Sequence, residues 1–68
     1  MVKLTRLNDQ EFYVNSDLIE FIESTPDTII SLTTGKKLIV KETLDEIIDL
    51  IIEYKSKALR NVDALIKN

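Results

Sequence analysis

The feature that most constrains the fold is a helical repeat of apolar residues in the last third of the chain. Thr43 and Glu46 form a capping box, in which each side chain can bond the other residue's backbone N–H and so start a helix. No proline or glycine interrupts the chain after them, and the pattern predicts one helix over residues 44–66, about 34 Å long. Its apolar positions recur at intervals of three and four: Leu44, Ile47, Ile48, Ile51, Ile52, Ala58, Leu59, Val62, Leu65 and Ile66.

The first forty residues instead show short strand patterns separated by turn signals. Clusters of Asn, Asp, Ser, Pro and Gly mark the turns and predict five strands, at residues 2–7, 10–14, 18–24, 28–33 and 36–41. The connections are too short for parallel crossovers, so the strands should pair antiparallel. We therefore expect an α+β fold in a single domain over residues 1–68: a five-stranded antiparallel meander followed by one long C-terminal α-helix.

Two features of these elements favour self-association. A six-residue strand spans only about 20 Å, so the last turns of the helix should extend beyond the sheet. The central strands also carry apolar side chains of both parities: alternation places Ile19 and Phe21 on one face and Leu18 and Ile22 on the other. One helix can cover only one face of the predicted sheet, which leaves the apolar side chains of the other face exposed. We expect a homo-oligomer or a partner protein to cover the rest, with the helix tail as the interface: Ala58, Leu59, Val62, Leu65 and Ile66.

Lys55 leaves two interpretations of this tail open, because it interrupts an otherwise heptad-like seam of apolar residues. In the first, Lys55 lies at the sheet edge with its ammonium group in water, and the tail is a modestly amphipathic end that frays. In the second, residues 44–52 pack on the sheet and residues 58–66 pack on another subunit or partner.

Composition excludes most catalytic chemistry. The 68 residues contain no cysteine and no histidine, so disulfides, thiolate chemistry and the commonest general base and metal ligand are absent. Glu20 and Glu23 have opposite strand parity and should not form an acid–base pair. We expect no catalytic residue, no cofactor, no metal site and no enzyme activity. The net charge of −3 argues against nucleic-acid binding, and the absence of a long apolar run predicts a cytoplasmic protein without membrane insertion.

Lys36 and Lys37 follow the turn at Gly35, at the tip of a predicted hairpin. Residues 33–37 superficially resemble a phosphate loop but lack its second glycine and lead into a strand rather than a helix. Two interpretations remain open for the two lysines. They form either a solvated rim that protects the sheet against edge-to-edge aggregation or a docking patch for an acidic protein surface.

Several short motifs, in order, resemble a family of small flagellar proteins called FlbD, or SwrD in swarming bacteria. The similarity covers roughly residues 2–55 and is carried by Leu4-Thr5-Arg6-Leu7-Asn8, Glu11-Phe12-Tyr13-Val14-Asn15, Asp17-Leu18-Ile19-Glu20-Phe21-Ile22-Glu23 and Leu32-Thr33-Thr34-Gly35-Lys36-Lys37. The resemblance implies a non-enzymatic accessory protein that supports motility, in some members by raising motor power for swarming. Its partner would be a flagellar or motor-associated protein.

A second resemblance points to another class of function. Residues 18–23, followed by a hairpin and the segment Thr43-Leu44-Asp45-Glu46, are similar to part of a LytTR-type DNA-binding domain. Such domains are longer and more basic than this chain. A small DNA-binding or regulatory module is therefore the alternative hypothesis.

Overall fold

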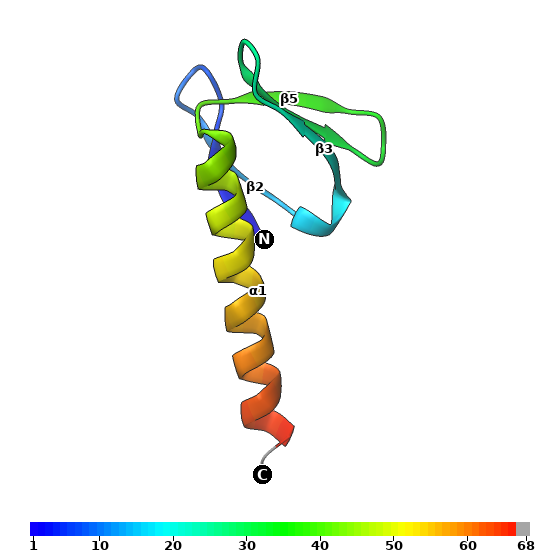
Figure 1. Cartoon of the computed structure of the whole chain (residues 1–68), viewed down its shortest axis with the longest axis vertical. Helices are drawn as coiled ribbons and strands as arrows, with labels where there is room; N and C mark the ends of the chain where they lie inside the picture. Colours follow the sequence, from blue (N-terminus) through cyan, green and yellow to red (C-terminus); the bar gives the residue numbers. More distant parts are fainter. Residues whose placement is uncertain (67–68) are drawn as a thin grey trace.

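The protein folds into five short strands followed by one long helix (Figure 1). The computed structural model describes the backbone of residues 1–66 and the side chains of residues 1–59. All pairings between the strands are antiparallel, and this confirms the predicted α+β class. The elements are β1 (Val2–Thr5), β2 (Glu11–Val14), the short 3-10 helix η1 (Ser16–Leu18), β3 (Ile19–Glu23), β4 (Thr28–Leu32), β5 (Lys37–Val40) and α1 (Leu44–Ile66).

The five strands are divided between two sheets, a β1–β2 hairpin and a β3–β4–β5 meander. The hairpin turns at Asn8 and Asp9, where Asp9 adopts a left-handed backbone with φ 69° and the Asn8 side chain accepts a hydrogen bond from the Gln10 N–H at 3.0 Å. Gly35 supplies the same left-handed geometry, with φ 91°, between β4 and β5. Between β2 and β3 the chain forms η1, so the two strands do not pair as a hairpin.

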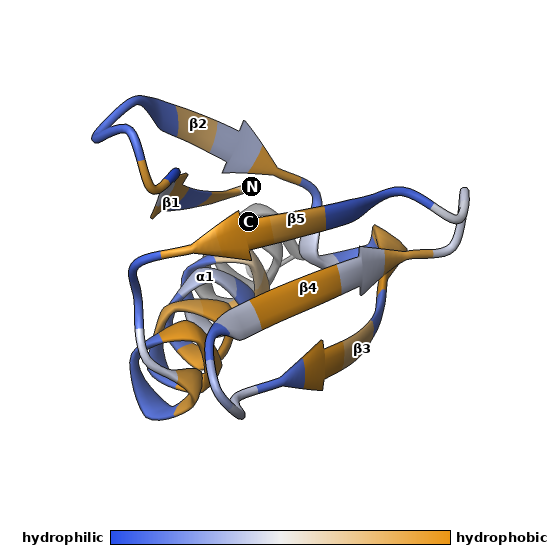
Figure 2. Ribbon diagram, turned by 90° about the horizontal axis from the view of Figure 1, so that it is seen from above, coloured by the Kyte–Doolittle hydropathy of each residue, from blue (hydrophilic) through white to orange (hydrophobic). Residues whose placement is uncertain are grey.

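The two sheets meet where β1 ends and β5 ends (Figure 2). Arg6 and Val40 form an isolated antiparallel bridge, and the Lys41 N–H donates to the Thr5 carbonyl at 2.8 Å. The strands therefore follow the spatial order β2, β1, β5, β4, β3, with α1 packed against the concave side of this bent layer. The predicted set of five neighbouring strands is present, but the sheet bends sharply at this junction.

The hydrophobic core lies between α1 and this bent layer. Leu4 of β1, Ile30 of β4 and Ile47 of α1 are fully buried, with 0% exposure each. The same cluster contains further buried side chains from β1, β2 and β5: Val2, Val14, Leu38 and Val40. Each of these strands contributes alternate residues to the core, as expected for strands with one buried face.

The prediction for the faces of β3 was wrong at one position. The pairing register shifts between Ile19 and Phe21, which marks a bulge at Glu20. A bulge inserts one residue and reverses the alternation beyond it. As a result Ile19 and Ile22 both pack against the core, while Phe21 is 60% exposed on the outer face.

The helix α1 extends well beyond both sheets (Figure 1). Its N-terminus has the predicted capping box: the Glu46 N–H donates to the Thr43 hydroxyl at 3.2 Å, and the Thr43 N–H donates to the Glu46 carboxylate at 3.3 Å. Its first half contacts β1 and the core, and the rest projects, which gives the molecule extents of 47 × 22 × 19 Å. Within the described part of the chain, no helix combines the length and hydropathy that a membrane span requires.

The core of α1 predicts a sharp contrast between two isoleucines. Ile47→Ala creates a cavity in the core and should lower the free energy of unfolding by about 2–5 kcal/mol. Ile52→Ala removes a side chain that is 58% exposed and should change the free energy of unfolding by less than about 0.5 kcal/mol. Urea denaturation of both variants at low protein concentration measures the difference. An equal loss in the two variants would contradict the assigned core.

Candidate docking surfaces

Within the described residues, the informative features are surfaces. No group of three or more acidic side chains is placed to hold a metal ion within the described part of the chain. The surfaces fall into four groups: the junction before α1, the exposed side of α1, the outer face of the β3–β4–β5 sheet, and a shallow groove between β1 and α1. The junction positions the second and third relative to each other.

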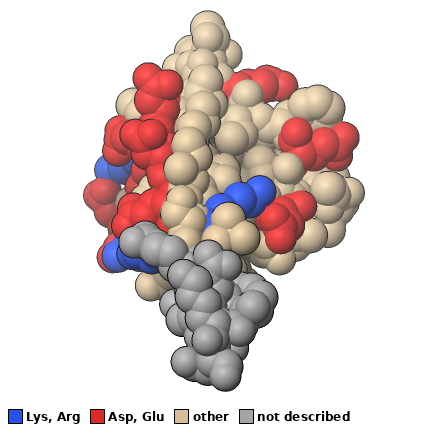
Figure 3. Space-filling view, turned by 60° about the horizontal axis from the view of Figure 1, so that its bottom comes forward, with Lys and Arg blue, Asp and Glu red and all other residues tan. Residues whose placement is uncertain are grey.

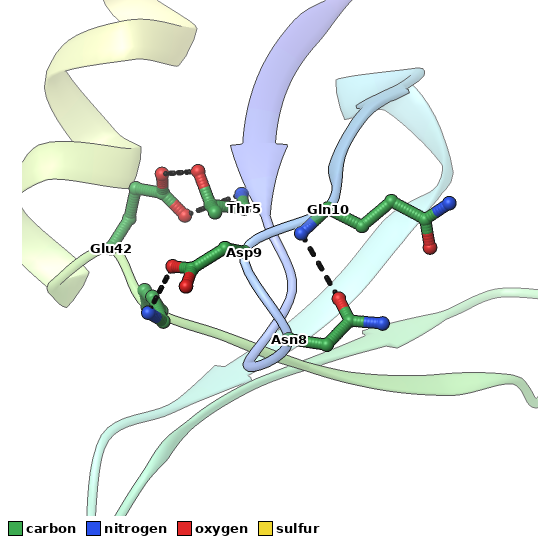
Figure 4. Close-up of polar contacts among 6 residues, drawn as sticks. Thr5, Asn8, Asp9, Gln10 and Glu42 are labelled. Atoms are coloured by element: carbon green, nitrogen blue, oxygen red, sulfur yellow. Dashed lines mark hydrogen bonds and ion pairs between the residues drawn. The ribbon is translucent and has the colours of Figure 1, made fainter.

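At the junction, Glu42 receives two hydrogen bonds from Thr5 (Figure 4). The Thr5 N–H donates to Oε1 at 2.8 Å, and the Thr5 hydroxyl donates to Oε2 at 2.8 Å. Asp9 of the β1–β2 turn pairs with the ammonium group of Lys41. Together these contacts fix the hairpin against the segment between β5 and α1, and so set the direction in which the helix leaves the sheet.

The hydrogen bonds of Glu42 change the pKa of its carboxyl group. Partial burial acts to raise this pKa, but the hydrogen bonds donated by Thr5 to the charged carboxylate outweigh it, so the pKa is lowered from the ordinary value of 4.5. The carboxylate is therefore stabilised as the anion in the folded state.

The β1–β2 hairpin also contains a cation–π contact, in which the Arg6 guanidinium lies 4.5 Å from the centroid of the Phe12 ring.

A stripe of apolar side chains on α1 is exposed. Ile48 is 41%, Ile52 is 58% and Leu59 is 66% exposed, and their spacing of four and seven residues places them on one side of the helix. We call these three residues the helix stripe. Of the predicted interface, Ala58 and Leu59 are exposed, whereas Val62, Leu65 and Ile66 belong to the helical backbone but their side chains lie outside the described residues. The Lys55 ammonium lies 4.0 Å from the Asp17 carboxylate of η1, at the edge of the sheet layer.

Acidic side chains run beside the helix stripe. Asp45, Asp49 and Glu53 recur every four residues and are all exposed, and we call them the acidic ridge. Figure 3 shows a band without charged groups, with acidic side chains most dense along its left side and further acidic and basic groups on its right. Lys57 pairs with Glu53 at 3.1 Å near the C-terminal end of the ridge. An apolar strip with a negative border favours a partner surface with a positive border.

The outer face of the β3–β4–β5 sheet carries a second apolar patch. The register aligns Phe21 with Ser31 and Lys37 in one row across the sheet, and Glu23 with Ile29 and Ile39 in the next. Ile39 is 41% exposed and Phe21 is 60% exposed. We call Phe21, Ile29 and Ile39 the outer patch. Sequence analysis noted apolar residues of both parities in these strands but did not select this face as a site.

Lys37 borders the outer patch at one end of β5, and Lys36 precedes it in the turn. Both are exposed. Lys36 holds the hairpin through its carbonyl, which accepts the Leu32 N–H at 2.8 Å, so its side chain is not needed for the turn. Neither ammonium group forms an ion pair with any residue whose side chain the structure describes. The predicted docking patch therefore lies next to the apolar outer patch. The sequence pattern alone did not reveal that these two features are neighbours.

A shallow groove of about 220 Å³ lies between the N-terminal end of β1 and the side of α1. Its walls include Tyr13, Leu50 and Tyr54, with Lys3, Glu53 and Lys57 at the margin. Lys3 is held by Glu11 at 3.1 Å, and the hydrogen bond and charge of Glu11 raise the pKa of the Lys3 ammonium. The charges at this margin are thus already paired in part with one another.

Comparison with known proteins identifies the family. A family model described as "Flagellar and Swarming motility proteins", FlbD, matches residues 1–59. The chain belongs to the FlbD family. No curated protein and no solved structure matches the chain. The FlbD match includes all five strands and the first part of α1, and therefore the outer patch, the two lysines and the helix stripe.

Membership of the FlbD family confirms the first of the two resemblances, and with it a relation to flagellar and swarming motility. Nothing in the family match supports the LytTR-type alternative. The match ends at residue 59, so part of the predicted helix-tail interface lies beyond the region shared with the FlbD model. The surfaces within the matched region are the better basis for a functional argument.

The Thr5–Glu42 contact predicts an acid-dependent loss of stability. Because the folded-state pKa of Glu42 lies below its ordinary value of 4.5, its contribution is present above pH 4.5 and is lost as the pH falls through the lower value. Glu42→Gln should therefore show a shallower fall in unfolding free energy in this acidic range. Urea denaturation at a series of pH values measures the slope. The control is Glu23→Gln, an exposed β3 carboxylate without such contacts, and a Glu42→Gln slope equal to the control's would contradict the assignment.

Proposed function

We propose that this FlbD-family chain is a non-enzymatic accessory protein of the bacterial flagellar system. It supports motility and swarming through protein–protein contacts in the cytoplasm, and motor power is the property that it raises. The observation that carries the proposal is the exposed apolar surface on elements matched by the family model. Single exposed apolar residues are ordinary on protein surfaces, but contiguous apolar patches on a small domain mark interaction sites.

Two surfaces would make the contacts. Lys36 and Lys37, at the end of β5, would dock an acidic surface of a flagellar or motor-associated protein, and the adjacent outer patch would supply apolar contact. The helix tail, comprising Ala58, Leu59, Val62, Leu65 and Ile66, would pack on another subunit or on the partner. Leu59 supports this role because 66% of it is exposed. Neither surface requires a bound cofactor or metal ion.

The docking patch predicts a motility defect without loss of the protein. Lys36→Glu with Lys37→Glu reverses the charge of the patch while leaving the core intact. Swarming expansion and swimming speed should fall toward those of a strain that lacks the protein. Both are measured in that strain after complementation, with immunoblots to verify an unchanged protein level.

A charge-exchange variant provides the control. Lys3→Glu with Glu11→Lys exchanges the two ends of an exposed 3.1 Å ion pair on the β1–β2 hairpin and leaves the net charge unchanged. It should retain full motility. Full motility of the Lys36→Glu, Lys37→Glu variant at normal protein level would remove the basic hairpin from the functional surface.

The helix tail predicts a change in mass in solution. Val62→Asp with Leu65→Asp places two charges in the proposed interface and should lower the mass of any assembly toward that of the 7.8 kDa chain. Light scattering at several protein concentrations measures it. An unchanged oligomeric mass would exclude the tail from the interface.

A further inference from the structure

The helix stripe and the outer patch have complementary borders. The helix stripe is flanked by the acidic ridge. Along β5 the outer patch is flanked by Lys37 at one end and, just beyond the other end, by Lys41, which also pairs with Asp9. Glu23 lies on the opposite, β3 side of the patch. The two surfaces lie on different faces of the same molecule, because the core side of the β3–β4–β5 sheet is already covered by α1. They therefore cannot meet within one chain.

The dimensions of the two surfaces also correspond. Lys37 and Lys41 are four strand residues apart, about 13 Å, and Asp45 and Glu53 are eight helical residues apart, about 12 Å. Three strands span about 10 Å from edge to edge, which matches the width of a helix with its side chains. A helix laid on the outer face would thus cover all three strands and bring its acidic ridge to the basic edge.

We propose that α1 of one molecule packs on the outer face of the β3–β4–β5 sheet of a second copy of the same chain. The helix stripe lies on the outer patch, and the acidic ridge faces Lys37, with Lys36 next to it in the turn. Each three-stranded sheet in the assembly is then covered by a helix on both faces, its own on the core side and a neighbour's on the outer side. The inference rests on the proposed function in one respect, that the chain acts through protein contacts, and it assigns the outer patch to another copy in place of the flagellar or motor-associated protein.

The charge pattern favours this arrangement over a symmetric pairing of two helix stripes. In an antiparallel pair of identical helices, each flank meets the same flank of its partner, so the acidic ridges would face each other. Like charges at close range oppose such a contact, whereas the helix-on-sheet arrangement brings acid to base. The contact joins two different surfaces and therefore closes into a ring or continues into a chain. The expected solution mass consequently exceeds that of one chain at high concentration.

Neutral substitutions within the two surfaces test the apolar part of the contact. Phe21→Ser and Ile52→Ser each remove an exposed side chain from one half of the interface. Each should raise the Kd of self-association about tenfold or more, measured by light scattering and sedimentation of the full chain. Tyr13→Ser is the matched control, since Tyr13 is 68% exposed on β2 and lies outside both surfaces. It should associate like the wild type.

Charge reversal in separate molecules tests the orientation. A ridge variant, Asp45→Lys with Asp49→Lys, has two basic surfaces, and a face variant, Lys36→Glu with Lys37→Glu, has two acidic ones. Each alone should remain at the 7.8 kDa mass of the single chain. In an equimolar mixture, the basic helix of the ridge variant meets the acidic face of the face variant, and the acidic helix of the face variant meets the basic face of the ridge variant. The two variants should therefore associate with each other. Circular dichroism establishes that both variants fold.

A second mixture separates docking from general attraction between oppositely charged proteins. Ile52→Ser is added to both the ridge and the face variant, which keeps every charge and removes the centre of the helix stripe. This mixture should lose most of the association. Equal association in the two mixtures, or a wild type that stays at the mass of one chain at all concentrations, would overturn the proposal. A face variant that keeps the wild-type mass would overturn it in favour of stripe-to-stripe pairing.

The outcome is independent of the motility test. If the chain is monomeric but Lys36→Glu with Lys37→Glu abolishes motility, the proposed function stands and the outer face docks a different protein. If Phe21→Ser and Ile52→Ser disrupt the assembly while both retain full motility, self-association stands and the assembly is not what supports motility.

Discussion

The structure depends on one contact made just before the helix begins. Thr5 donates both its N–H and its hydroxyl to Glu42, beside the bridge between Arg6 and Val40. This contact joins a two-stranded hairpin, which is marginally stable by itself, to a three-stranded sheet. It also fixes where α1 starts, and hence which helical residues enter the core. Ile47 is buried and Ile52 is exposed because they lie on different sides of the helix, and Leu50 and Ile51 still pack against the core.

The same geometry explains why so small a protein has so much apolar surface outside its core. A 23-residue helix is longer than strands of four or five residues can cover. The bent layer of strands wraps the first half of the helix and leaves the outer face of the β3–β4–β5 sheet open. Both uncovered surfaces are bordered by charge, of opposite sign. These are the two surfaces that we propose for protein contacts in this chain of the FlbD motility family.

Sequence patterns predicted the elements well where the signal was local. The capping box of Thr43 and Glu46 located the start of α1, and Asn8-Asp9 and Gly35 located two turns, because these residues determine their own backbone geometry. The face of Phe21 was predicted incorrectly. The bulge at Glu20 is set by pairing with β4 rather than by residues in β3, so counting by twos along one strand could not detect it. The outer patch was missed as a site for the same reason, since its members come from three strands whose register no single segment specifies.

The sequence by itself determined the class of fold, the length of the helix, the lack of histidine and cysteine and, through an ordered set of short motifs, the family. These properties depend on residue type and on spacing within one segment. Only the tertiary structure decided which apolar residues are covered, that Glu42 holds Thr5 thirty-seven residues away, and that Lys37 lies in a row with Phe21. Those relations are set by strand register and by the direction of the helix, which arise from many distant contacts acting together.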